Sequence, residues 1–266
     1  MSAHAEPIVD AGELRDHIRA MYREVAEQPD GDFHFELGRS VAERLGYPGE
    51  WLDAVPPAAL ASFAGVGHML DLAAVEPGDT VLDLGSGSGT DAFVAAHLSG
   101  PTGRVIGVDM TDAQLAKARG LRDGLGLEHV QFVEGLIEDP PVDPGSVDVV
   151  ISNGVVNLSP DKEGVFRAAA RALRPGGRLA IADIVSAREL IERTRRNVAL
   201  WAACIAGAVP QEDYLGAIEA AGLRVETVRD NRYRFLSPRA LAAADKYGVT
   251  SVTVLATKPE DARSSR

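Results

Sequence analysis

The sequence predicts an α/β fold in which a mostly parallel, seven-stranded sheet carries helices on both faces and is preceded by a helical segment. Short apolar runs bounded by turn residues alternate with stretches of helical spacing, and strands that alternate with helices of this length form parallel sheets covered on both faces. The chain has 266 residues, of which 45% are hydrophobic and 25% charged. That is enough for one large α/β domain with additions.

The first part of the chain, residues 1–75, is expected to form a helical lobe. Apolar residues recur at helical spacing in the stretch 13–27. A second helix is expected over 33–45, where the sequence Gly-Tyr-Pro-Gly at 46–49 ends it, and shorter helices over 57–63 and 67–74. This lobe is expected to act as a lid over the domain that follows.

The strands are expected to fall at short apolar runs of residues 76–258, and the last residues, 259–266, to form a flexible tail. The predicted strands are 80–84, 105–108, 130–133, 147–152, 178–182, 223–229 and 250–256. The predicted helices of this domain are 90–98, 111–124, 161–173, 190–205, 211–221 and 237–247.

Charge and composition exclude several functions. Lysine and arginine total 27 against 39 aspartate and glutamate, a net charge of -12, which disfavours nucleic-acid partners. No apolar run approaches the ~20 residues of a membrane span, and the N-terminal residues show no signal peptide, so we expect a cytoplasmic location and no membrane partner. One cysteine, Cys204, allows no intrachain disulfide and no cysteine-rich metal site, and we predict no metal.

A glycine-rich turn follows the first predicted strand, in the sequence VLDLGSGSGT at 81–90. Gly85, Gly87 and Gly89 allow the backbone to turn sharply and to approach a ligand, and the amides of the helix that follows suit an anionic group. Asp109 ends the next strand, where a carboxylate can accept both hydroxyls of a ribose. The glycine spacing differs from that of dinucleotide sites, and the absence of a following Gly-Lys-Ser/Thr excludes a phosphate-binding loop. The alternative interpretation is a tight turn that binds no ligand.

These residues resemble motifs I and II of class I S-adenosylmethionine-dependent methyltransferases, and the resemblance continues through GLIE at 135–138, VVISN at 149–153 and LRPGGRL at 173–179. It implies the Rossmann-like fold of that class and S-adenosyl-L-methionine as cofactor. The cofactor positions that it implies are Asp83, Gly85, Ser86, Gly87, Gly89, Asp109, Met110, Gln114, Ile137, Glu138, Asn153 and Val155. Asp83 is alternatively a cap of the glycine loop, and Met110 and Ile137 are alternatively core residues.

Four segments are similar in sequence to those of arsenite methyltransferases. They are LDLGSGSGTD, VDMT, ISNGVVNLSPDK at 151–162 and CIAGA at 204–208. The signature of that family carries a cysteine where this chain has Gly154, its second cysteine matches Cys204, and residues 30–68 hold none. Trivalent arsenic needs several converging thiolates. We therefore expect transfer of a methyl group to a small organic molecule, on carbon or oxygen. Arsenite methylation and cofactor binding without methyl transfer are the alternatives.

Methyl transfer from a sulfonium is an in-line displacement, in which the protein aligns donor and acceptor and excludes water. An oxygen acceptor needs a base, and the candidates are His34, His68 and Tyr22, which lie in the predicted lobe. A carbon acceptor needs alignment and stabilisation of developing charge. The sequence leaves monomer and homodimer equally open.

Overall fold

A seven-stranded sheet forms the centre of the molecule in a computed structural model that describes residues 9–33, 35–197, 200–201, 205–236 and 238–260. The strand order is β3-β2-β1-β4-β5-β7-β6. Strands β1 to β5 pair in parallel, and β7 is antiparallel to both of its neighbours. The strands are β1 (Thr80–Leu84), β2 (Arg104–Asp109), β3 (Val130–Glu134), β4 (Val147–Asn153), β5 (Leu173–Val185), β6 (Arg224–Asp230) and β7 (Thr250–Thr257). The predicted fold class is confirmed.

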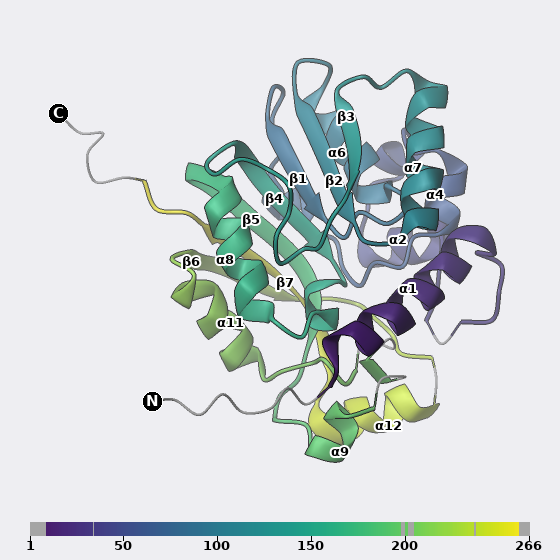
Figure 1. Cartoon of the computed structure of the whole chain (residues 1–266), viewed down its shortest axis with the longest axis vertical. Coiled ribbons are helices and arrows are strands. Elements are labelled where there is room, and N and C mark those ends of the chain that lie inside the picture. Colours follow the sequence, from purple (N-terminus) through teal and green to yellow (C-terminus); the bar gives the residue numbers. More distant parts are fainter. Residues whose placement is uncertain (1–8, 34, 198–199, 202–204, 237, 261–266) are drawn as a thin grey trace.

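Helices cover both faces of this sheet. Adjacent residues of β1 point to opposite faces, so Val81 and Leu82 belong to two different hydrophobic clusters. The first cluster includes Phe93 of α6 (Thr90–Ser99) and Leu115 of α7 (Asp112–Leu125). The second includes Phe166 of α8 (Lys162–Ala172) and residues of α11 (Gln211–Ala220). Figure 1 shows α8 and α11 together on the side of the sheet away from α6 and α7.

The N-terminal helices join the same core as the sheet. They are α1 (Ala11–Glu27), α2 (Arg39–Leu45), α3 (Gly49–Asp53), α4 (Pro57–Ala61) and α5 (Leu70–Ala73). Leu14 and Ile18 of α1 are buried in the first cluster beside residues of α6 and α7. The α1 helix lies across one end of the sheet (Figure 1), where Gln114 Nε2 donates to the carbonyl of Tyr22 at 2.8 Å and Lys117 Nζ to that of Ala26 at 2.9 Å. The lobe therefore closes over the carboxyl ends of the strands.

Two predicted helices differ from those observed. The helix expected over 33–45 begins only at Arg39, because Gly38 has φ 95° and ψ -173°, which no helix accommodates. In the described part of the helix expected over 190–205, α9 spans Glu192–Arg195 and residues 200–201 are helical, and the Trp201 indole donates to the carbonyl of Arg195 at 2.6 Å, at the end of α9. The remaining elements are α12 (Pro238–Tyr247) and the 3₁₀ turn η1 (Val156–Leu158).

None of the described helices is both long and apolar enough to cross a bilayer.

Candidate active site

A cavity lies at the carboxyl ends of β1 to β4, beneath α1, and its volume is about 990 Å³ when the space open to solvent is counted. Cavities of this kind at the edge of a parallel sheet hold small molecules and cofactors. Tyr22 and all but one of the predicted cofactor positions line it. These are Asp83, Gly85, Ser86, Gly87, Asp109, Met110, Gln114, Ile137, Glu138, Asn153 and Val155.

The glycine loop is held against the end of β2 by backbone and carboxylate hydrogen bonds. The amide of Gly85 donates to the carbonyl of Val108 at 2.7 Å. Asp109 accepts from the Gly87 amide at 2.9 Å and from the Thr111 amide at 2.8 Å. Gly85 has φ +78°, and a Cβ there would lie 2.5 Å from Cγ1 of Val155, so any other residue would clash with this side chain. The loop is thus a cradle that only glycine permits, and Asp109 fixes its shape.

Gly89 is the predicted cofactor position that does not line the cavity. It begins α6 with φ +95°, and a Cβ there would lie 2.8 Å from Phe132 Cζ and 2.9 Å from Phe93 Cε2. The residue therefore allows α6 to approach the sheet closely, which gives it a role in packing.

Two carboxyl groups face the cavity from the end of β1 and the start of α6. Asp83 is 2% exposed, and its Oδ2 has no hydrogen-bond partner among the described residues. Burial, followed by the charges of Asp91 and Asp109, raises the pKa of Asp83 well above its usual value. Burial also raises the pKa of Asp91, to about 6, against hydrogen bonds from Tyr47 and Asn153 that lower it. Burial likewise raises the pKa of Asp109, against the amides that it accepts from.

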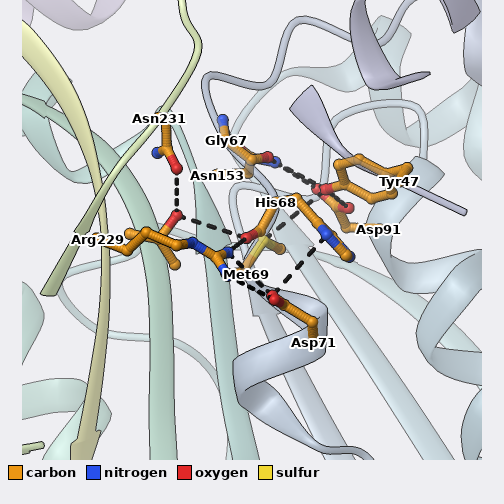
Figure 2. Close-up of polar contacts among 10 residues, drawn as sticks. Tyr47, Gly67, His68, Met69, Asp71, Asp91, Asn153, Arg229 and Asn231 are labelled. Carbon is orange, nitrogen blue, oxygen red and sulfur yellow. Dashed lines mark hydrogen bonds and ion pairs between the residues drawn. The ribbon is translucent and has the colours of Figure 1, made fainter. Parts of the chain in front are cut away.

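Asn153, at the end of β4, connects the lobe to the glycine-loop helix. Its Oδ1 accepts from the Val66 amide at 2.8 Å, and its Nδ2 lies 3.0 Å from Tyr47 Oη and 3.1 Å from Asp91 Oδ2. The Tyr47 hydroxyl donates to Asp91 Oδ1 at 2.5 Å. Figure 2 shows Tyr47, Asp91 and Asn153 converging beside the Gly67 backbone. The sequence predicted Asn153 as a site residue, but Asp91 and Tyr47 were missed. The one sequence signal for Asp91 was its position in GTD, directly after the glycine motif. No sequence signal pointed to Tyr47.

The loop before α5 is also anchored from the far edge of the sheet. Arg229 of β6 donates to the carbonyl of His68 at 2.5 Å and pairs with Asp71, as Figure 2 shows. The Ser251 hydroxyl of β7 donates to the carbonyl of Val66 at 2.7 Å. Contacts from β4, β6 and β7 therefore fix this loop, and with it the cavity wall formed by residues 62–65.

His68 does not reach the cavity. It is 5% exposed, and its ring lies 4.3 Å from that of Tyr47 and 5.6 Å from that of Trp51, between ring centroids. Burial lowers its pKa, against the neighbouring Asp71. The structure thus places His68 in the packing of the lobe and not at the pocket wall that we expected. His34 and Cys204 lie outside the described residues.

Glu138, which lines the cavity, faces α1. It accepts from Ser159 Oγ at 2.6 Å and lies 3.8 Å from Arg15 Nη2 of α1. Arg15 is the only lysine, arginine or histidine among the described residues that line the cavity. The aspartates and Glu138 outnumber it, so the cavity favours a ligand that carries positive charge. A sulfonium cofactor with an adenosine group fits this donor and acceptor set, because the free Asp83 oxygen and the glycine cradle accommodate it.

Comparison with known proteins identifies the class. The family described as "Methyltransferase domain" matches residues 75–222, more than half of the chain. The chain therefore belongs to this family, and its fold is that of the class I enzymes that use S-adenosylmethionine, as the sequence predicted.

Within the family, the chain is similar to arsenite methyltransferases. It is 41% identical over 204 residues to that of Halobacterium salinarum, covering 76% of this chain and 52% of the relative. It is 43% identical over 170 residues to that of Aquipseudomonas alcaligenes, covering 61% and 49%. The chain spans about half the length of these curated relatives. A crystal structure of an arsenic(III) S-adenosylmethionine methyltransferase from Chlamydomonas reinhardtii matches with a TM-score of 0.63 and 32% identity, covering 85% of this chain and 75% of that one.

Proposed function

We propose that the chain binds S-adenosylmethionine in the cavity and transfers its methyl group to a small organic molecule held beneath the lobe 1–75. The observation that carries the cofactor assignment is that one cavity collects the glycine loop, Asp109 and the ends of β3 and β4. The bound cofactor supplies a methyl group activated on a sulfonium. Asp109 accepts from the ribose hydroxyls, while Ile137 and Glu138 contact the adenine and Asp83 faces the methionine portion.

The remaining wall of the cavity favours an organic acceptor. Ile18, Tyr22, Phe63 and Leu158 line it with apolar and aromatic surface. Such walls bury an uncharged carbon skeleton and exclude water from the reacting atoms. The lobe contributes three of these four side chains, so it both orients the acceptor and closes the site.

Calorimetric titration tests the cofactor assignment. S-adenosylmethionine and S-adenosylhomocysteine are titrated into the wild type, Asp109→Ala and Asp112→Ala. Asp109 accepts two loop amides, and a charged hydrogen bond contributes about 1.5–3 kcal/mol, so Asp109→Ala should weaken binding at least about tenfold. Asp112 lies three residues away, is exposed and pairs with Arg23, so Asp112→Ala should bind as the wild type does. If the wild type binds neither ligand, the proposed cofactor site is refuted.

Arsenite methylation is the second candidate, because the arsenite methyltransferases above are similar over much of this chain. The residues argue against it, since the chain contains one cysteine and Gly154 lines the cavity where the similar family carries another. Gly154 has φ +74°, which also strains any side chain there. A labelled-methyl assay with arsenite and thiol beside a panel of organic acceptors decides between the two, because methylated arsenic without any methylated organic product would refute the organic assignment.

A further inference from the structure

Asp91 is a buried carboxyl group of the cavity that is held by two side-chain donors. It lies in the first turn of α6, is 7% exposed and lines the cavity. Tyr47 donates to its Oδ1 and Asn153 Nδ2 lies 3.1 Å from its Oδ2 (Figure 2). Two side-chain donors hold the carboxylate in place, and each of its oxygens retains a lone pair for a third partner.

Asp83 is the other titratable group that faces Asp91, and the surroundings of the two carboxyls differ. Asp83 has an oxygen without a partner among the described residues and is stabilised by the Ala92 amide alone, whereas Asp91 has the Tyr47 and Asn153 donors. Hydrogen bonds to a carboxylate favour its charged form, so Asp91 is the more readily ionised of the two. Burial raises the pKa of Asp91 to about 6, which suits a base that works near neutral pH.

No histidine of the described chain lines the cavity, and its one cation, Arg15, faces Glu138. Tyr47 is unsuited as a base, because burial and the charge of Asp91 raise its pKa well above 10 and keep it a donor. The Asp91 carboxylate lies next to Asn153, and Phe63 and Gly65 line the same cavity. A hydroxyl carried on an apolar skeleton would meet it there.

We propose that Asp91 is the general base of the reaction and that the acceptor is a phenol or an enol, an assignment that rests on the proposed function. The proton of the acceptor hydroxyl moves to the Asp91 carboxylate. The oxygen lone pair forms the new bond to the methyl carbon as the methyl–sulfur bond breaks, and that electron pair stays on sulfur, which becomes a thioether. Tyr47 and Asn153 position the carboxylate.

The first test needs no acceptor. Binding of S-adenosylmethionine and of S-adenosylhomocysteine is measured calorimetrically near the pKa of Asp91, in two buffers that differ in ionisation enthalpy, which gives the protons released with each ligand. The cationic sulfonium should drive Asp91 to ionise, so the wild type should release more protons with S-adenosylmethionine. Asp91→Asn should abolish this difference in proton release. Asp183→Asn is the control, because Asp183 is also buried and accepts from a tyrosine but lies outside the cavity, and this variant should show the same difference as the wild type. An unchanged difference in Asp91→Asn would overturn the proposal, and absence of all binding would instead refute the cofactor site.

The second test follows methyl transfer to 1-naphthol and to 4-nitrophenol against pH. In the wild type, kcat/KM for 1-naphthol should rise through a pKa of about 6, and Asp91→Asn should lower it by about 100-fold or more and remove the rise. The loss should shrink for 4-nitrophenol at a pH where it is already ionised. Tyr47→Phe removes a donor and should move the rise to higher pH, whereas Tyr214→Phe, the matched tyrosine of Asp183, should not. An Asp91→Asn variant with a wild-type profile, or a wild type that binds cofactor yet methylates neither phenol, would contradict the assignment.

Discussion

The glycine that begins α6 gives a direct test of how the sequence holds the site together. Gly89→Ala adds one methyl group at φ +95°, 2.8 Å from Phe132 Cζ and 2.9 Å from Phe93 Cε2. Both rings are buried in the first hydrophobic cluster and pack edge to face on each other at 5.5 Å between centroids. Neither can move away without disturbing the cluster, so α6 must shift off the sheet or the rings must leave their rotamers.

The cost follows from two separable contributions. A left-handed backbone costs an ordinary residue about 1–2 kcal/mol, and overpacking of a filled core costs about 1–3 kcal/mol. Gly89→Ala should therefore lower the free energy of unfolding by about 2–5 kcal/mol. Gly126→Ala is the matched control, since Gly126 ends α7 with φ +65° and no described atom lies within 4 Å of the added methyl. It should cost only the backbone contribution.

Urea denaturation of the two variants beside the wild type measures this difference. Gly89→Ala should be less stable than Gly126→Ala by about 1–3 kcal/mol, the overpacking contribution. Equal loss in the two variants would refute the close packing of α6 on Phe132 and Phe93. A Gly89→Ala variant of full stability that had lost only cofactor binding would restore Gly89 to the cofactor site.

Three further changes have expected results of different sign. Gly120→Ala, within α7 and with no described atom within 4 Å of the new methyl, should raise the free energy of unfolding by about 0.5–1 kcal/mol in urea denaturation. Gly67→Ala should lower it by about 1–3 kcal/mol and weaken acceptor binding, because the added carbon lies 2.2 Å from Asn231 Nδ2 and 2.7 Å from Ala182 Cβ; wild-type stability would contradict the anchored loop. Lys162→Met tests a pH dependence. Burial lowers the pKa of Lys162 to about 8, so between this value and 10.5 the unfolded chain binds the proton that the folded chain has lost. Lys162 should therefore make stability rise with pH across that window, a rise that the variant should lack when unfolding is measured at several pH values.

The strands were predictable because their signal is local. The runs at 80–84 and 130–133 are apolar, end at turn residues and coincide with β1 and β3 nearly residue for residue. The helix expected over 190–205 is interrupted at 196–197, after α9, where the Trp201 side chain donates to the carbonyl of Arg195. Helix propensity, which is judged over a stretch of neighbouring residues, gives no information about that contact. The same holds for Gly89, whose role depends on two aromatic rings brought to it by α6 and β3.

Some residues of the cavity can be predicted from a sequence motif, whereas others come together only in the folded structure. Asp109 was predictable because the residue that ends the second strand of a doubly wound sheet lies beside the glycine turn that follows the first strand. Asp91 was not, because its chemistry depends on Tyr47, 44 residues earlier, and on Asn153, 62 residues later. His68 was predicted from the composition of its segment, but its orientation is set by its packing on Tyr47 and Trp51.

The two buried tyrosine–aspartate pairs have similar chemistry, but only one of them lines the cavity. Tyr47 donates to Asp91 and Tyr214 to Asp183, and burial raises the pKa of each aspartate to about 6. Asp183 also accepts from the Asn157 amide at 2.8 Å, and the charge of Lys162 favours its ionised form, so its interactions are satisfied within the fold. No described lysine, arginine or histidine is paired with Asp91, which faces the cavity instead. A sulfonium bound in the cavity, as proposed above, would supply a positive charge near it.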